Sequence, residues 1–339
     1  MVTSPADLED TKILVAPSAD RKQQLTVYSN LVKNKSATNA MILPVVAPHS
    51  VKFINLSKYN DIFEDCDKSF PVRFAYDGND EEEGITCFSM NESYLEVQDV
   101  GSYKCSVANS IADLQRVDPR VFTITQDFVD VLTQHYDAQY WGFIICKIRD
   151  GATDSFEEYH PIAYTHSLIG GKLFIPTRHY HGTPSANPQV ANDWDHTIYV
   201  HNASIDCEIP DGRWGKYTTM ETNKCKVAWN SVPGFTAETF KRFFRYKING
   251  TFDNKDLLAT LVSQQYTRPV EGGLSIMNKL KELRPVQTVL IPNSTQQESA
   301  TSTDEHVITT NSFANRPAVN TQPPEDPYWL YAKMSDMYR

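Results

Sequence analysis

Segments of strand length dominate this chain from residue 25 to residue 201. Each is a short run that is apolar or alternates between apolar and polar residues, and Gly, Pro, Asp, Asn or Ser usually separates it from the next. The segments are 25–32, 41–46, 51–56, 72–76, 85–89, 94–97, 103–108, 140–148, 157–167, 172–181 and 194–201. We therefore expect a β-rich N-terminal and central part with mostly antiparallel strands.

Two of these segments carry more specific expectations. Turn-forming residues at 34–39 separate 25–32 from 41–46, which predicts a hairpin, and the second strand is apolar enough to be buried on both faces. The near-continuous apolar run 140–148 has the length and composition of a central strand.

Helical spacing of apolar residues occurs in fewer places. It predicts a short helix within 58–70 and a second helix over 125–137, which residues 123–126 could cap. After Pro233-Gly234 it recurs through 236–284, with Phe240, Phe243, Phe244 and Ile248 on one face. Strands before helices favour an α+β fold over a βαβ repeat.

The domain organisation has two alternatives at its N-terminal end. A soft boundary near Val100 would divide a β-rich layer, 1–100, from an α+β main body, 101–292, but one domain fits equally well. About half of residues 293–327 are Ser, Thr, Asn or Gln, which predicts a flexible, low-complexity linker.

The last residues, 328–339, are too apolar to belong to that linker. Asp326 is a suitable N-cap and Pro327 suits the first helical position, so we expect a short helix that docks on the body or on another molecule. The predicted docking residues are Tyr328, Trp329, Leu330, Tyr331, Met334, Met337 and Tyr338.

Charge and hydropathy argue against two classes of partner. A formal net charge of −10 repels a phosphate backbone and gains nothing from an anionic membrane surface. No uninterrupted apolar run approaches the length that spans a bilayer, and no signal peptide is recognisable. We expect neither nucleic-acid nor membrane binding.

The six cysteines, 66, 87, 105, 146, 207 and 225, show no CxxC pair and no tight spacing. They are therefore expected to be reduced thiols in a cytoplasmic, reducing compartment, with none in a disulfide.

Histidine is concentrated between residues 160 and 201, which hold six of the nine. If Gly170-Gly171 lies in the turn of a hairpin formed by 157–167 and 172–181, His160 faces His181, and both share a face with His179. Such a face could hold zinc or a non-haem iron with help from Asp193, Asp195 or His196. The alternative is that these histidines are structural or lie on the surface.

The recognisable catalytic motifs are absent: there is no GxSxG, P-loop, GxGxxG or HExxH sequence. The leading hypothesis is therefore a non-catalytic structural or interaction protein, a component of a larger assembly, which needs no cofactor and binds a protein partner through the C-terminal peptide. The alternative is a metal-dependent hydrolase or oxygenase that uses the histidine hairpin. A third possibility, a small-ligand binding module, has no discriminating residue in its favour.

Overall fold

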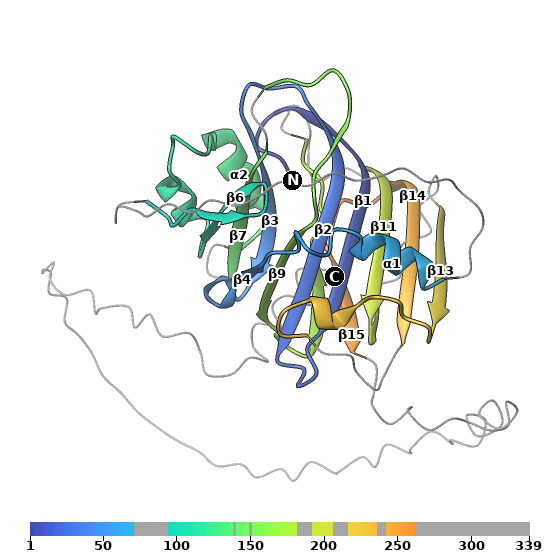
Figure 1. Ribbon diagram of the computed structural model, residues 1–339. Coiled ribbons are helices and arrows are strands. Elements are labelled where there is room, and N and C mark those ends of the chain that lie inside the picture. The colour runs from blue at the N-terminus through green and yellow to red at the C-terminus, as the bar shows by residue number, and fades with distance from the viewer. Residues whose placement is uncertain are drawn as a thin grey trace, which may run out of the picture. The chain divides into compact units, whose positions relative to one another are not determined.

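The computed structural model describes residues 1–70, 94–137, 140–148, 151–181, 192–205, 216–235 and 242–261. These residues belong to one compact unit, which includes Met1–Gln264. They form three β-sheets and two α-helices (Figure 1).

The largest sheet has eight strands. Along its main path the order is β13 (Lys216–Thr222), β14 (Phe243–Phe252), β11 (Asn192–His201), β1 (Ala6–Pro17), β2 (Gln23–Asn34), β9 (Ile162–Ser167) and β4 (Lys52–Ile54), and β8 (Glu157–Glu158) pairs with β2. Strands β1 and β11 are parallel, and the other pairs are antiparallel.

Two smaller sheets complete the β structure of the described residues. One has the order β3 (Asn39–Val46), β7 (Trp141–Ile148), β6 (Tyr103–Ala108) and β5 (Gln98–Val100). The other has the order β10 (Lys172–Ile175), β15 (Leu257–Leu261) and β12 (Ala203–Ile205). All residues of β3 are buried, and β7 lies inside its sheet, as the apolar runs predict.

The helices lie close to the predicted positions. Helix α1 (Ile62–Lys68) falls within 58–70, and α2 (Gln126–His135) begins after Thr125, whose side chain accepts a hydrogen bond from the Phe128 amide. The described residues also form three 3-10 turns between these elements, at Pro48–Ser50, Ala112–Arg116 and Trp229–Ser231.

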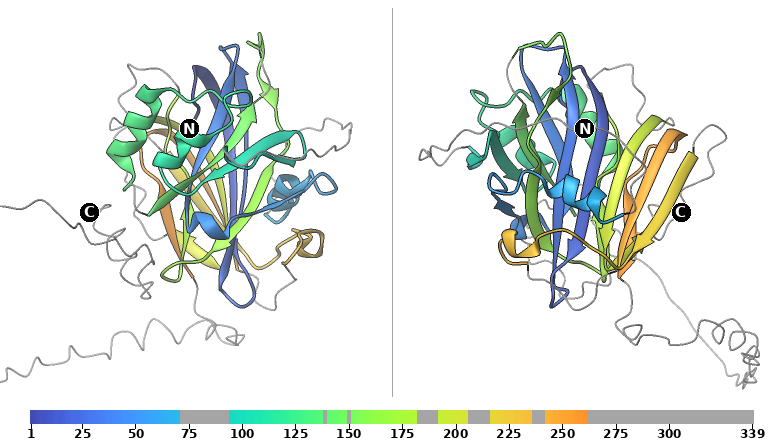
Figure 2. Two further views of the ribbon diagram at one scale, coloured as in Figure 1. Left: turned by 90° about the vertical axis from the view of Figure 1, so that its left-hand side faces the viewer. Right: turned by 45° about the vertical axis from the view of Figure 1, so that its right-hand side comes forward.

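Alternating side chains of the large sheet enter two cores. In β1, Ile13 and Val15 join a core shared with the two smaller sheets, whereas Leu14 and Ala16 join a core that contains residues of α1. A third core lies between the four-stranded sheet and α2. Helix α1 therefore covers the large sheet, and α2 covers the outer face of the four-stranded sheet (Figure 2).

The β-rich part of the predicted fold is confirmed, but the predicted helices over 236–284 are wrong where the structure describes them. Residues 243–252 and 257–261 form β14 and β15. Phe244, Tyr246 and Ile248 also alternate, and pairing with β11 on one side and β13 on the other outweighs the helical stripe. The remainder of 236–284 lies outside the described residues.

Both predicted hairpins are wrong, because the paired segments belong to different sheets. Strand β2 pairs with β1 and β9, whereas β3 pairs with β7. Strand β9 pairs with β2 and β4, whereas β10 pairs with β15, and Ile169 and Lys172 form only an isolated bridge. Turn residues mark where a strand ends but do not choose its partner.

Among the other expected strands, residues 94–97 do not form one. The segments 72–76 and 85–89 lie outside the described residues, as do the predicted linker at 293–327 and the peptide at 328–339.

Candidate functional site

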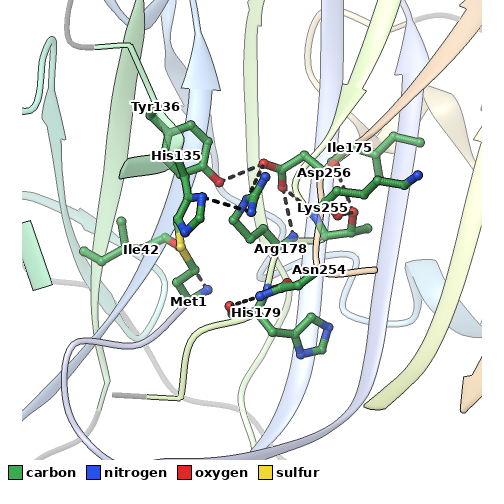
Figure 3. Close-up of polar contacts among 11 residues, drawn as sticks. Met1, Ile42, His135, Tyr136, Ile175, Arg178, His179, Asn254, Lys255 and Asp256 are labelled. Atoms are coloured by element: carbon green, nitrogen blue, oxygen red, sulfur yellow. Dashed lines mark hydrogen bonds and ion pairs between the residues drawn. The ribbon is translucent and has the colours of Figure 1, made fainter. Parts of the chain in front are cut away.

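The segment 177–181 follows β10 and carries the predicted ligands His179 and His181. Asn254 holds its backbone: the side-chain oxygen accepts from the His179 amide at 2.7 Å, and the side-chain nitrogen donates to the His179 carbonyl at 2.9 Å. Asp256 Oδ1 accepts from the amides of Thr177 and Arg178, both at 2.9 Å. The loop between β14 and β15 thus fixes the position of this segment (Figure 3).

The second carboxylate oxygen of Asp256 faces a small aromatic and cationic group. It accepts a hydrogen bond from the Tyr136 hydroxyl at 2.7 Å, and the Arg178 Nε lies 3.9 Å away. Arg178 also lies over the Tyr136 ring, 5.8 Å from its centroid, and contacts His135 Nδ1 at 3.3 Å. The Asp256 side chain is only 1% exposed, so its charge is held by protein partners in place of water.

Three histidines meet beside this network, and we call them the histidine cluster: His179, His181 and His196. The Nε2 atoms of His179 and His196 are 3.1 Å apart, and His179 Nδ1 is 3.4 Å from His181 Nε2. His181 Nδ1 faces the Ala6 carbonyl at 3.4 Å. His196 comes from β11, so the cluster joins β11 to the segment after β10.

One choice of tautomers allows every contact of the histidine cluster to be a hydrogen bond while all three rings are neutral. If His181 Nδ1 donates to the Ala6 carbonyl, then His179 Nδ1 donates to His181, and His196 Nε2 donates to His179. The remaining nitrogen, His196 Nδ1, is then an unprotonated acceptor, and it is buried without a hydrogen-bond partner among the residues that the structure describes. The rings form a chain of hydrogen bonds.

Burial favours the neutral form of each ring in this chain. It lowers the pKa of His196 from 6.5 to about 3 and that of His179 well below its ordinary value, the latter with help from the neighbouring His196 and His181. Burial also lowers the pKa of His181. The Trp194 ring packs on both His179 and His196, with centroid separations of 5.7 and 4.8 Å.

The other predicted metal ligands, His160, Asp193 and Asp195, form hydrogen bonds with groups outside the histidine cluster. His160 Nε2 accepts from the Ser102 amide at 2.7 Å, and its ring packs against Tyr103. Asp193 accepts from the Thr251 hydroxyl at 2.6 Å, and Asp195 accepts from the backbone amide of Asp10. The predicted common face of His160, His179 and His181 does not form, because β9 and β10 are in different sheets.

The histidine cluster does not converge on one point, because His181 and His196 contact opposite nitrogens of His179. Among the described residues, no group of three or more His, Cys, Asp or Glu side chains could hold a metal ion. Burial of Asp195 raises the pKa of its carboxyl group, and Asp195 Oδ1 lies 3.7 Å from His196 Nδ1, beyond hydrogen-bond distance.

Sequence reasoning missed Tyr136, Arg178, Asn254 and Asp256. Each is a single polar residue in an ordinary local context, and the hydrogen bonds of Asn254 and Asp256 span 75 to 120 residues of sequence. No motif or periodicity in the chain marks such a network.

A second notable feature is the outer edge of β13, which we call the open edge. Strand β13 pairs with β14 on one side, and no strand within the described residues pairs with it on the other. It has seven residues and a regular register with β14, without a bulge, and five of its side chains are exposed, including Tyr217 at 40%. Unpaired amides and carbonyls along such a strand are a template for another strand.

Parts of three other sheet edges, those of β3, β10 and β12, are covered by the chain itself. The bridge between Val2 and Met41 and the hydrogen bonds of residues 1–3 cover β3. The Gln24 side chain both donates to and accepts from the backbone of Phe174 in β10. The Tyr246 hydroxyl accepts from the Ile205 amide in β12. Strand β4, at the opposite end of the large sheet, has only three residues.

The open edge is basic, although the whole chain is acidic. Residues 216–226 and 242–252 contain six Lys or Arg residues and one acidic residue, Glu221. Glu221 accepts from Arg242 at 2.6 Å, and Arg245 pairs with Asp67 at 2.9 Å. Lys216, Lys224 and Lys247 are exposed and form no ion pair within the described part of the chain.

The cysteines agree with the predicted reduced state where they can be seen. Cys66, Cys105 and Cys146 are free thiols, and Cys105 and Cys146 face each other across β6 and β7 with their sulfur atoms 3.4 Å apart. Cys87 and Cys207 lie outside the described residues. No helix in the ranges that the structure describes is long and apolar enough to cross a membrane.

Comparison with known proteins gives no family for this chain. No protein-family model matches it, and no curated protein matches it. Among solved structures it is similar to baculovirus P35, at 13% identity over 76% of this chain and 98% of that chain, with a TM-score of 0.39. It is also similar to a mutated baculovirus P35 after caspase cleavage, at 12% identity over 75% and 100%, with a TM-score of 0.42.

A third similar structure is the caspase-8/P35 complex, at 13% identity over 75% of this chain and 97% of that chain, with a TM-score of 0.40. Similarities at this level of identity and TM-score establish neither a family nor a partner for this chain.

Proposed function

We propose that this chain is a non-catalytic interaction protein, a component of a larger assembly, that binds an extended segment of a partner protein along the open edge of β13. The observation that carries the proposal is the contrast between this edge and the others. Hydrogen bonds from the chain's own residues reach the edges of β3, β10 and β12, whereas the outer side of the seven-residue strand β13 has no partner among the described residues. Strand addition to such an edge is a recurring mode of peptide recognition.

The buried polar residues around Asp256 and the histidine cluster support the non-catalytic part of this proposal. Asp256, Asn254, His179 and His196 are buried and His181 is half-buried, and their hydrogen bonds join β11, α2 and the loop after β14 to the segment 177–181. Groups used in this way stabilise a fold and leave no open position for a substrate. The metal-dependent alternative loses its support, since it depended on the hairpin that does not form.

Proline substitution tests the open edge directly. Amides of neighbouring residues in an antiparallel strand point to opposite edges, so either Thr218 or Thr219 donates to β14 and the other points outward. Thr219→Pro and Thr218→Pro therefore form a matched pair: the variant that loses the inward amide should melt earlier, and the other should keep its melting temperature but present a blocked edge.

The probe is a library of random peptides displayed on phage and selected on the wild-type protein. We expect the enriched peptides to lose binding to the proline variant that keeps the wild-type melting temperature. A library that yields no binders, or binders that both proline variants retain, would contradict binding at this edge.

A further inference from the structure

The open edge differs from its surroundings in charge, and this difference specifies its partner. We infer that β13 accepts an extended segment of a partner protein in which acidic residues alternate with apolar or β-branched residues. This inference rests on the proposed function. A second copy of this chain is a poor occupant, because pairing of two β13 strands would bring two basic edges together.

The acidic positions follow from the register between β13 and β14. Thr218 lies opposite Lys247 and Lys216 opposite Asn249, so Lys216, Thr218 and Lys247 share one face of the sheet. Lys216 and Lys247 are exposed and form no ion pair within the described residues. Carboxylates on this face of an added strand would lie beside two unpaired ammonium groups.

The apolar positions follow from the opposite face. Tyr217, Thr219 and Glu221 lie there, opposite Ile248, Tyr246 and Phe244, which are core residues. Tyr217 is one of two large hydrophobic side chains exposed among the described residues, and the charge of Glu221 is paired with Arg242. A β-branched or aromatic residue of the added strand would extend the apolar surface over Tyr217 and remove it from water.

Three synthetic peptides of equal length test this inference: Thr-Glu-Val-Glu-Val-Glu-Thr and its counterparts with Gln or Lys in place of Glu. Titration of the full chain is followed by the chemical shifts of the β13 amides, which also detects weak binding. We expect the Glu peptide to bind about tenfold more tightly than the Lys peptide, with the Gln peptide between them, and added salt to reduce the difference.

The double variant Lys216→Glu/Lys247→Glu should reverse this order. The matched control Lys52→Glu/Lys58→Glu should leave it unchanged, because it changes two exposed lysines in and after β4, the strand at the other end of the large sheet from β13. Equal binding of all three peptides at β13 would overturn the acidic preference but leave strand addition standing. Absence of shifts at β13 with every peptide would overturn both proposals.

Discussion

At the scale of single residues, four histidines are buried among the described residues, His166, His179, His196 and His201, and burial lowers the pKa of each. The concentration of histidines in the sequence drew attention to His179, His181 and His196, but it did not distinguish a metal site from structural histidines. Histidine rings that lie close together can bind one metal ion or form hydrogen bonds with one another. The positions of all six ring nitrogens in the histidine cluster distinguish these two possibilities. Here opposite nitrogens of His179 are engaged, which no spacing in the sequence reveals.

Neutral buried histidines make the stability of the fold depend on pH. Burial lowers the pKa values of His166 and His201 to about 4 and that of His196 to about 3, all from 6.5. Because the folded state binds these protons less tightly than the unfolded state, their contribution is fully present above about pH 6.5. It is lost progressively as the pH falls from there toward 3.

The variant His196→Gln tests this dependence, because an amide can still donate to His179 but does not titrate. We expect the plot of unfolding free energy against pH, from urea denaturation between pH 4 and 6, to become shallower by up to one proton, about 1.4 kcal/mol per pH unit. The control His49→Gln changes an exposed ring and should keep the wild-type slope. An unchanged slope in His196→Gln would show that this ring is already protonated in the folded state.

At the scale of secondary-structure elements, the sequence predicts most strand positions between residues 25 and 201 but misses β1, β13, β14 and β15, and it predicts strand partners poorly. The apolar runs that became β3 and β7 were recognisable because a strand buried on both faces has no polar residue to alternate with. The stripe in residues 240–248 was misleading, because Phe243 and Phe244 suit a helix face and also the two faces of a strand. Pairing with β11 and β13 decides, and it depends on residues far away in the sequence.

Asp256 lies in the loop between β14 and β15, and its hydrogen bonds to the amides of Thr177 and Arg178 position the segment 177–181. Asp256→Ala would leave two amides and a phenol without their acceptor, and Arg178 without the carboxylate that lies 3.9 Å from its Nε. We expect a loss of about 3–5 kcal/mol in unfolding free energy, measured by chemical denaturation. Asp256→Asn keeps one acceptor oxygen and should lose less.

The matched control for this prediction is Asp253→Ala, three residues away and exposed, which should stay within about 0.5 kcal/mol of wild type. If Asp256→Ala were as stable as Asp253→Ala, the network around Asp256 would have no structural importance.

At the scale of the whole molecule, the described unit consists of a large sheet, two smaller sheets and a helix on each outer side. Most strands of this arrangement contribute residues to a core, and the open edge of β13 can be recognised only from the order of strands in the large sheet. In the sequence, residues 216–222 give no such signal, because an exposed strand of Lys, Thr and Glu resembles a loop.

The predicted docking of the C-terminal peptide is independent of the open edge and stays a prediction, since residues 326–339 lie outside the described part of the chain. Deletion of 326–339 distinguishes its two alternatives. A peptide that docks on another molecule leaves the melting temperature unchanged on deletion, but light scattering shows the loss of a bound partner or of an assembly. If the peptide packs on its own unit, its deletion lowers the melting temperature and leaves the mass of the complex unchanged.

The matched control keeps the length of the chain and replaces Leu330, Tyr331 and Met334 by Ser, which removes the apolar stripe alone. We expect this control to reproduce the deletion, because an isolated helix of about a dozen residues is marginal in water and is ordered by burial of that stripe. If the Ser variant behaved like wild type while the deletion did not, the peptide would be recognised by its backbone or its charges, and the helical docking model would be wrong.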